Sequence, residues 1–228
     1  MEPKIKGKAF NYNDTRDRKF YDVFVWMFHP LAKIVFKTQY IGRENVPKTG
    51  SLIIASNHRN SYDPGLIAAA RVRKIHYMAK LELFNLNKLA SWMLRHLNAF
   101  PISRGTGDQR SLNYAIRLVE EGKVLGIFPE GTRSKDGEIH RFKAGAFTLA
   151  KEAGAEILPV VLDGTKTLIK KNLAFNWGNR ITVRVLPPVP AERGAALETH
   201  ELMQEVHERM GTALGEVRNE KLKVKDQK

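Results

Sequence analysis

The sequence predicts a layered α/β fold, in which helices flank a largely parallel central sheet. From residue 42 onward, short apolar runs typical of strands alternate with amphipathic stretches typical of helices, and this alternation favours a parallel sheet. The chain has 228 residues, 43% of them hydrophobic, which is enough for one large core. We expect a basic segment with aromatic-rich helices over residues 1–41, an α/β domain over 42–190, and a C-terminal helix with a basic tail over 191–228.

The first half of the α/β domain begins with a buried strand. Residues Ser51 to Ser56 form a short run rich in Ile and Leu, as expected for a strand covered on both faces. Pro64 to Ala70 is predicted to be a helix with Asp63 as its N-cap, because proline is favoured at the first helical position. The elements expected next are a strand over Lys74–Ala79, a helix over Leu86–His96 and a strand over Asn98–Ile102.

The second half continues the alternation of helices and strands. Leu112, Ile116 and Val119 recur at helical spacing and predict the apolar face of a helix that Gly122 ends. A strand over Val124–Phe128 leads into a polar loop. The remaining expected elements are a helix over Ala144–Ala153, strands over Ile157–Leu162 and Ile181–Val185, and a long amphipathic helix over Glu198–Val217.

The charge balance indicates an anionic partner. A formal net charge of +14 attracts nucleic acid, anionic lipid or an acidic carrier protein, and composition does not choose among them. The basic runs at Lys4–Lys19 and Arg218–Lys228 are expected to be solvated tails. The absence of cysteine excludes a disulfide framework, a thiolate nucleophile and a cysteine-ligated metal, and it fits a reducing compartment.

The stretch from Phe20 to Tyr40 is rich in aromatic residues, but charged residues and Pro30 interrupt it. A membrane-spanning helix needs roughly 20 mostly apolar residues, so we do not expect this stretch to cross a bilayer. Two interpretations stay open: a pair of core helices bent at Pro30, or a helical segment at a membrane interface. In the second interpretation the interfacial residues are Phe20, Phe24, Trp26, Phe28, Lys33 and Lys37.

The segment Asn57–Asp63, which follows the first strand, holds the candidate catalytic pair His58 and Asp63. Residues five apart lie about 140° apart on a regular helix, so only a turn can bring these two side chains together. The carboxylate would then orient the imidazole and leave its other nitrogen free to take a proton. Without a cysteine or a serine in a nucleophile elbow, a substrate hydroxyl would attack directly. A structural N-cap aspartate beside an incidental histidine is the alternative.

The loop Phe128–Ser134 offers backbone amides, hydroxyls and a guanidinium within one turn. Such a loop can hold a phosphate, because arginine binds phosphate through two hydrogen bonds. The alternative is a charged turn with a Glu130–Arg133 ion pair. Lys80 and Arg104 follow two other expected strands, and the carboxyl ends of parallel strands meet at one edge of a sheet. We therefore expect four strand ends to form one site.

Together these motifs resemble those of the glycerolipid acyltransferase family, typified by 1-acylglycerol-3-phosphate acyltransferase, over roughly residues 40–190. The departures are Asn60, where the family usually has serine, and Asn98, where glycine is common. Neither removes a catalytic group, but both could change acceptor preference. The matching segments are His58 to Asp63, Asn98 to Arg104, Phe128 to Ser134 without a substitution, and Ile157 to Val160.

The resemblance implies that His58 is the general base for an acceptor hydroxyl and that Asp63 orients it. It implies acyl transfer to the sn-2 hydroxyl of lysophosphatidic acid, from a thioester of coenzyme A or acyl carrier protein, with no bound cofactor or metal. The residues implied to bind the substrate are Lys80, Arg104, Glu130, Gly131, Thr132 and Arg133.

The implied location is the cytoplasmic face of the cell membrane, with the chain bound peripherally or monotopically to an anionic surface. Another lysolipid acceptor is the nearest alternative to lysophosphatidic acid. A basic nucleic-acid-binding protein is a remote one, because the sequence shows no helix-turn-helix, RNP-like or zinc-ligand pattern.

Overall fold

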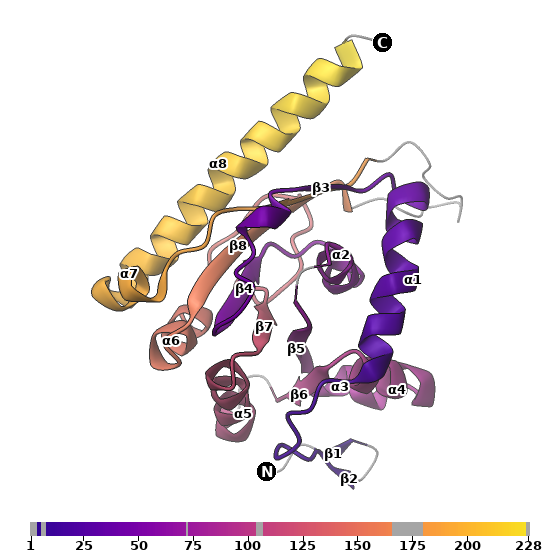
Figure 1. The fold of residues 1–228 in the computed structure, drawn as a ribbon, viewed down its shortest axis with the longest axis vertical. Helices are drawn as coiled ribbons and strands as arrows, with labels where there is room; N and C mark the ends of the chain where they lie inside the picture. Colours follow the sequence, from indigo (N-terminus) through magenta and orange to yellow (C-terminus); the bar gives the residue numbers. More distant parts are fainter. Residues whose placement is uncertain (1–3, 6–7, 72, 104–106, 166–179, 227–228) are drawn as a thin grey trace.

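A central sheet with helices on both faces organises the chain (Figure 1). The computed structural model describes residues 4–5, 8–71, 73–103, 107–165 and 180–226. Within them, a seven-stranded sheet has the order β3-β9-β8-β4-β7-β5-β6. Its strands are β3 (Gln39–Ile41), β4 (Leu52–Ser56), β5 (Ile75–Lys80), β6 (Ala99–Ile102), β7 (Val124–Ile127), β8 (Glu156–Asp163) and β9 (Thr182–Val185), and a separate hairpin pairs β1 (Lys4–Ile5) with β2 (Lys8–Ala9).

Five neighbouring strands, from β8 to β6, run parallel, and β9 pairs antiparallel with β8. The register places Ile53 of β4 between Leu125 of β7 and Ile157 of β8. The carboxyl ends of the five parallel strands therefore lie along one edge of the sheet, which we call the carboxyl edge. The expected layered, largely parallel α/β fold is confirmed.

The helices divide between the two faces of the sheet. One buried cluster joins β4 and β8 to α1 and α2, and another joins them to α5, α6 and α8. The helices are α1 (Lys19–Val35), α2 (Asp63–Ala69), α3 (Leu81–Asn85), α4 (Lys88–His96), α5 (Gln109–Glu120), α6 (Gly145–Glu152), α7 (Ala191–Ala196) and α8 (Thr199–Asp226), with a short 3-10 turn, η1, at Arg43–Asn45.

Strand β4 shows why its sequence is apolar throughout. Ile53 and Ala55 pack on the side of α5, α6 and α8, whereas Leu52 and Ile54 pack on the side of α1 and α2. All four are at most 1% exposed. A strand covered on both faces has no solvent side, so its residues do not alternate between polar and apolar types. This strand carries the segment Asn57–Asp63 to the carboxyl edge.

Helix α1 is continuous through Pro30, so the interpretation of this stretch as a pair of helices is wrong. A proline inside a helix removes the hydrogen bond to the carbonyl four residues earlier, here that of Trp26. Pro30 and Trp26 are both exposed, so they lie on the outer side of the helix. The unpaired carbonyl therefore does not have to be buried in the protein core.

Two other expectations differ from the structure. The helix expected over Leu86–His96 is present as α4, which begins two residues later because the side chain of Asn87 accepts a hydrogen bond from Ala90 N at 2.7 Å and caps it. Helix α3, over Leu81–Asn85, was not expected. In α5 the buried face includes Ser111 and Tyr114, while Ile116 is only partly buried. Ser111 and Tyr114 can turn inward because their hydroxyls donate to backbone carbonyls at 2.9 and 2.8 Å.

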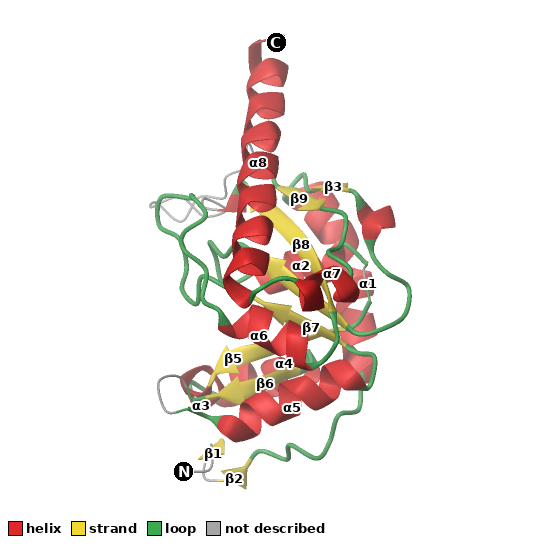
Figure 2. Cartoon of the chain, turned by 90° about the vertical axis from the view of Figure 1, so that its left-hand side faces the viewer, coloured by secondary structure: helices red, strands yellow, loops and turns green. Residues whose placement is uncertain are grey.

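Helix α8 packs on the sheet along only part of its length, and its C-terminal end extends beyond the sheet (Figure 2). The buried stripe consists of six apolar residues, which are Leu202, Val206, Met210, the adjacent pair Ala213 and Leu214, and Val217. The helix continues to Asp226. Residues 218–226 are therefore helical, and Asn219, Glu220, Leu222 and Lys223 among them are exposed.

Candidate active site

His58 and Asp63 are in contact at the carboxyl end of β4. His58 Nδ1 lies 2.9 Å from Asp63 Oδ2, the side chain of Asp63 is completely buried, and the His58 side chain is 19% exposed. The ring of Phe128, from the loop after β7, stacks on the imidazole at a centroid distance of 4.0 Å. A turn between the two residues therefore brings their side chains together, which a regular helix could not do.

Hydrogen bonds to Asp63 determine which imidazole nitrogen carries the proton. Asp63 Oδ2 also accepts the backbone amides of Arg59 at 2.6 Å and Asn60 at 2.7 Å. A carboxylate held by amide donors acts as an acceptor, so Nδ1 of His58 donates to it. His58 Nε2 is then the unprotonated nitrogen, and it makes no hydrogen bond with any described residue.

The expected N-cap role of Asp63 is wrong. Tyr62 is the N-cap residue of α2, no side chain caps that end, and Asp63 is the first helical residue. Its carboxylate accepts hydrogen bonds from His58, Arg59 and Asn60, which precede the helix, and does not cap the amides of α2. Asp63 is therefore not a helix N-cap, and its carboxylate contacts His58.

Asn57 positions the turn, a role that its sequence pattern did not reveal. Its side-chain amide donates to Leu162 O at 2.9 Å and accepts from Leu162 N at 2.8 Å. This pair of bonds joins the end of β4 to β8 in place of a backbone ladder, and Asn57 is 1% exposed. The only sequence feature that could have indicated this role is that the asparagine directly follows a buried strand.

Glu130 connects the loops after β4 and β7. Its Oε1 accepts the amide of His58 at 3.0 Å, and its Oε2 accepts the amide of His140 at 3.2 Å. Glu130 is 3% exposed, and burial raises the pKa of its carboxyl group above the ordinary 4.5, against the lowering effect of the two amides. Its two described hydrogen bonds are both to backbone amides, and the described residues show no Glu130–Arg133 ion pair, which was the alternative interpretation of this loop.

The rest of the Phe128–Ser134 loop forms an open surface beside His58. Ser134 N donates to His58 O at 2.7 Å, which holds the two loops together. Gly131 has a φ of 69° and lies under the side chain of Lys143, where an added Cβ would come within 3.0 Å. Thr132 and Arg133 are exposed, and the Arg133 guanidinium has no ion-pair partner among the described residues.

The other two predicted cations follow β5 and β6. Lys80 ends β5 at the carboxyl edge and is exposed, but β7 separates its strand from β4. No described contact joins Lys80 to His58 or Glu130. Arg104 lies outside the described residues. The structure thus brings the β4 and β7 loops into direct contact and places Lys80 at the same edge.

Basic residues of α8 contact the site loops, so the expectation of a solvated tail is wrong for Arg218 and Lys221. Arg218 donates to Glu138 Oε1 and to Gly137 O, both at 2.8 Å. Lys221 donates to Asp163 Oδ2 at 2.5 Å, at the carboxyl end of β8. Asp163 also lies 3.7 Å from the guanidinium of Arg59, which is 8% exposed. Only the long-range packing of α8 reveals these contacts.

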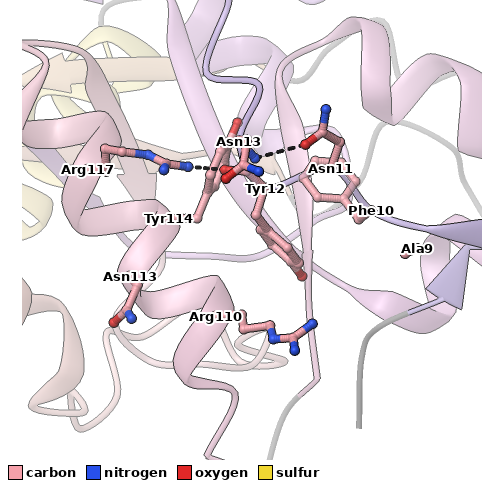
Figure 3. Close-up of a pocket in the computed structure, with 9 residues that line it drawn as sticks. All are labelled: Ala9, Phe10, Asn11, Tyr12, Asn13, Arg110, Asn113, Tyr114 and Arg117. Carbon is pink, nitrogen blue, oxygen red and sulfur yellow. Dashed lines mark hydrogen bonds between the residues drawn. The ribbon is translucent and has the colours of Figure 1, made fainter.

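A separate pocket of about 550 Å³ lies between residues 9–13 and α5 (Figure 3). Arg117 closes one side by donating to the carbonyl of Tyr12, and Asn13 N donates to Asn11 Oδ1 at 3.0 Å. Neither His58 nor Asp63 lines it, so we do not assign it to the reaction. Among the described residues, no group of three or more His, Cys, Asp or Glu side chains is arranged to hold a metal ion.

The structure divides the six candidate interfacial residues. Trp26 is 71% exposed, and Lys33 and Lys37 are exposed. Phe24 and Phe28 are partly buried and stack on each other at 5.2 Å over Gly65 of α2. Phe20 packs edge-on against Trp92 of α4 at 4.9 Å. In the described part of the chain, no helix is both long and apolar enough to cross a membrane.

The fold and the site define a layered α/β protein with a histidine–aspartate pair at the carboxyl edge of its sheet. Residues 37–163, more than half of the chain, match the acyltransferase family. The chain therefore belongs to the acyltransferase family.

Individual relatives agree with this assignment. The chain is 32% identical to the 1-acyl-sn-glycerol-3-phosphate acyltransferase of Bacillus subtilis, over 73% of this chain and 84% of that protein. It is also 32% identical to the enzyme of that name from Borreliella burgdorferi, over 64% of this chain but only 59% of that protein. The crystal structure of the 1-acyl-sn-glycerophosphate (LPA) acyltransferase PlsC from Thermotoga maritima has a TM-score of 0.69 and 29% identity, covering 85% of this chain and 78% of that one.

Proposed function

We propose that the protein transfers a fatty acyl group from an acyl thioester to the sn-2 hydroxyl of lysophosphatidic acid, giving phosphatidic acid. The observation that carries this proposal is the 2.9 Å contact between His58 Nδ1 and the completely buried Asp63. The names of the relatives support the acceptor. The thioester is that of coenzyme A or of acyl carrier protein, whose acidic surface would suit the +14 charge.

In the proposed reaction, His58 Nε2 accepts the proton of the acceptor hydroxyl as its oxygen attacks the thioester carbonyl. The carbon–sulfur bond then breaks, and the thiolate takes the proton from the imidazolium. Asp63 keeps the imidazole in the required tautomer and stabilises its charged form. General base catalysis of this kind contributes about 10²- to 10⁴-fold to the rate.

The acceptor phosphate binds beside His58 in this proposal. Arg133 is exposed on the loop that contacts His58 through Ser134 N, and a guanidinium can bind phosphate through two hydrogen bonds. Lys80 lies at the same edge, and Arg104 is included from its motif. Glu130, Gly131 and Thr132 shape this loop, with Glu130 acting through its two backbone hydrogen bonds.

The proposed location is the cytoplasmic face of the cell membrane, with α1 lying in the interface. The side of α1 opposite the buried Tyr21 and Ala32 exposes Trp26 at 71% and Ile34 at 74%. Exposed apolar and aromatic side chains with lysines nearby suit the headgroup region of a bilayer. A lipid acceptor also requires access to a membrane surface.

His58→Ala tests the catalytic proposal. Acyl transfer from labelled acyl-CoA and acyl-acyl carrier protein is measured in detergent against a panel of lysolipids. We expect kcat for lysophosphatidic acid to fall by about 10³-fold or more, because the general base is lost. His200→Ala, which removes an exposed histidine at the start of α8, serves as the matched control and should retain full activity.

Circular dichroism and thermal unfolding show whether each variant is folded. Substantial activity in a folded His58→Ala variant would sink the assignment of the base. Faster transfer to another lysolipid than to lysophosphatidic acid would contradict the proposed acceptor but not the assignment of His58 as the base.

A further inference from the structure

Helix α4 carries apolar residues on its exposed side as well as on the side that packs on the protein, where Leu94 contacts the core. Its exposed side carries Leu89, Trp92 and Met93, which are 71%, 46% and 44% exposed. These three residues lie within an arc of about 100°. The opposite side, which packs on the protein, includes Ser91 at 6% exposed. A helix whose outer side faced only water would carry polar residues at these three exposed positions.

The preceding helix α3 extends this apolar surface. Leu83 and Leu86 are 41% and 67% exposed. Single exposed apolar side chains are common on soluble proteins, but a contiguous group usually marks an interaction site. We name the group the α3–α4 surface; it consists of Leu83, Leu86, Leu89, Trp92 and Met93.

The α3–α4 surface is continuous with the exposed side of α1. The ring of Phe20 in α1 packs edge-on against Trp92 at 4.9 Å, and Figure 1 shows one end of α1 beside α4. Along α1, Val23, Met27 and Ile34 are 51%, 61% and 74% exposed. Three helices therefore contribute to one apolar face.

Cations border this face. Lys88 and Arg95 lie next to the apolar arc of α4 and are exposed, without an ion-pair partner among the described residues. Lys33 and Lys37 lie towards the other end of α1. Glu82, in the first turn of α3, is an acidic neighbour, so the border keeps a positive balance that complements an anionic lipid surface.

We propose that the α3–α4 surface is a second membrane-docking element, which inserts into an anionic leaflet together with α1. Helix α3 begins directly after Lys80, at the carboxyl edge of the sheet. Docking through α3 would therefore bring the edge that carries His58 towards the lipid from which the acceptor comes. The proposal rests on the proposed function, because it supplies that reaction with a lipid substrate.

Vesicle binding tests the proposal. The double variant Leu86→Gln/Leu89→Gln and the wild type are sedimented with vesicles of phosphatidylcholine and phosphatidylglycerol, and with phosphatidylcholine alone. We expect the double variant to bind the anionic vesicles at least about tenfold more weakly, since burial of even one leucine contributes that factor. Leu222→Gln, at a leucine of α8 that is 57% exposed, is the matched control and should bind like the wild type.

Acyl transfer in detergent micelles separates this proposal from the proposed function. We expect the double variant to keep wild-type activity there, because neither leucine belongs to the site. Wild-type vesicle binding by the double variant would overturn the docking proposal. So would a wild-type dimer that the double variant dissociates without loss of vesicle binding, since the surface would then join two copies. Absence of acyl transfer by the wild type would overturn the proposed function alone.

Discussion

The loops after β4 and β7 lie side by side at the carboxyl edge, but the key polar side chains of the first are buried and those of the second are mostly exposed. In the β4 loop, Asn57 and Asp63 are at most 1% exposed and several hydrogen bonds hold them in place. In the β7 loop, Thr132 and Arg133 are exposed. Glu130 belongs to the second loop but is buried and bonded to the amide of His58.

Under the proposed function, this difference predicts that the β4 loop serves proton transfer and the exposed β7 positions serve substrate binding. Proton transfer requires an imidazole in one tautomer and one orientation, and buried hydrogen bonds provide both. Binding of a charged headgroup requires accessible donors, which an exposed arginine supplies. We therefore expect substitutions in the β4 loop to change kcat and substitutions at the exposed β7 positions to change KM.

The largest expected effect in this comparison is that of Asp63→Asn. The amide is nearly the same size as the carboxyl group, but it can donate to Nδ1 of His58 and so favour the tautomer with the proton on Nε2. We expect kcat to fall by about 10³- to 10⁴-fold, with little change in KM. Steady-state kinetics in detergent measures this. A folded variant with near-wild-type kcat would show that the carboxylate does not orient the base.

A smaller effect is expected for Arg133→Ala. Loss of a charged hydrogen-bond donor to phosphate should raise KM for lysophosphatidic acid by about tenfold and leave kcat nearly unchanged. The control is Lys135→Ala, which removes an exposed cation two residues further along the loop. An equal rise in KM for both variants would mean that general positive charge, and not the guanidinium of Arg133, attracts the acceptor.

The smallest expected effect concerns stability and pH at Glu130, where the two loops join. Burial raises the pKa of Glu130 above 4.5 in the folded state, so the folded protein holds this proton more tightly than the unfolded chain. The stabilisation is complete below pH 4.5 and is lost as the pH rises through the folded pKa.

Glu130→Gln removes this titration. Urea unfolding of both proteins across this pH range should show the unfolding free energy of the wild type falling relative to that of the variant as the pH rises. A difference that stays constant with pH would contradict the raised pKa.

The local patterns of the sequence predicted most of the fold. Strands β4, β5, β6, β7 and β8 lie within one or two residues of the apolar runs that predicted them, because a buried parallel strand needs a continuous apolar run. Helix α4 begins two residues after its expected start, because the side chain of Asn87 caps it, and α3 was not predicted. Strand β3 pairs with β9, more than 130 residues away, and was not predicted.

The sequence by itself determined the residue types of the site: a histidine and an aspartate after one strand, and an acidic and basic loop after another. Only the tertiary structure decided how these residues are arranged. It turned Asp63 towards His58, bonded Glu130 to the His58 amide and brought Arg218 of α8 to Gly137. The exposure of Leu89 and Trp92 was likewise decided by packing. The physical reason is that composition and spacing determine structure only over a few neighbouring residues. The hydrogen bonds and burial of the site depend on segments of the chain that are distant in the sequence and meet only in the folded protein.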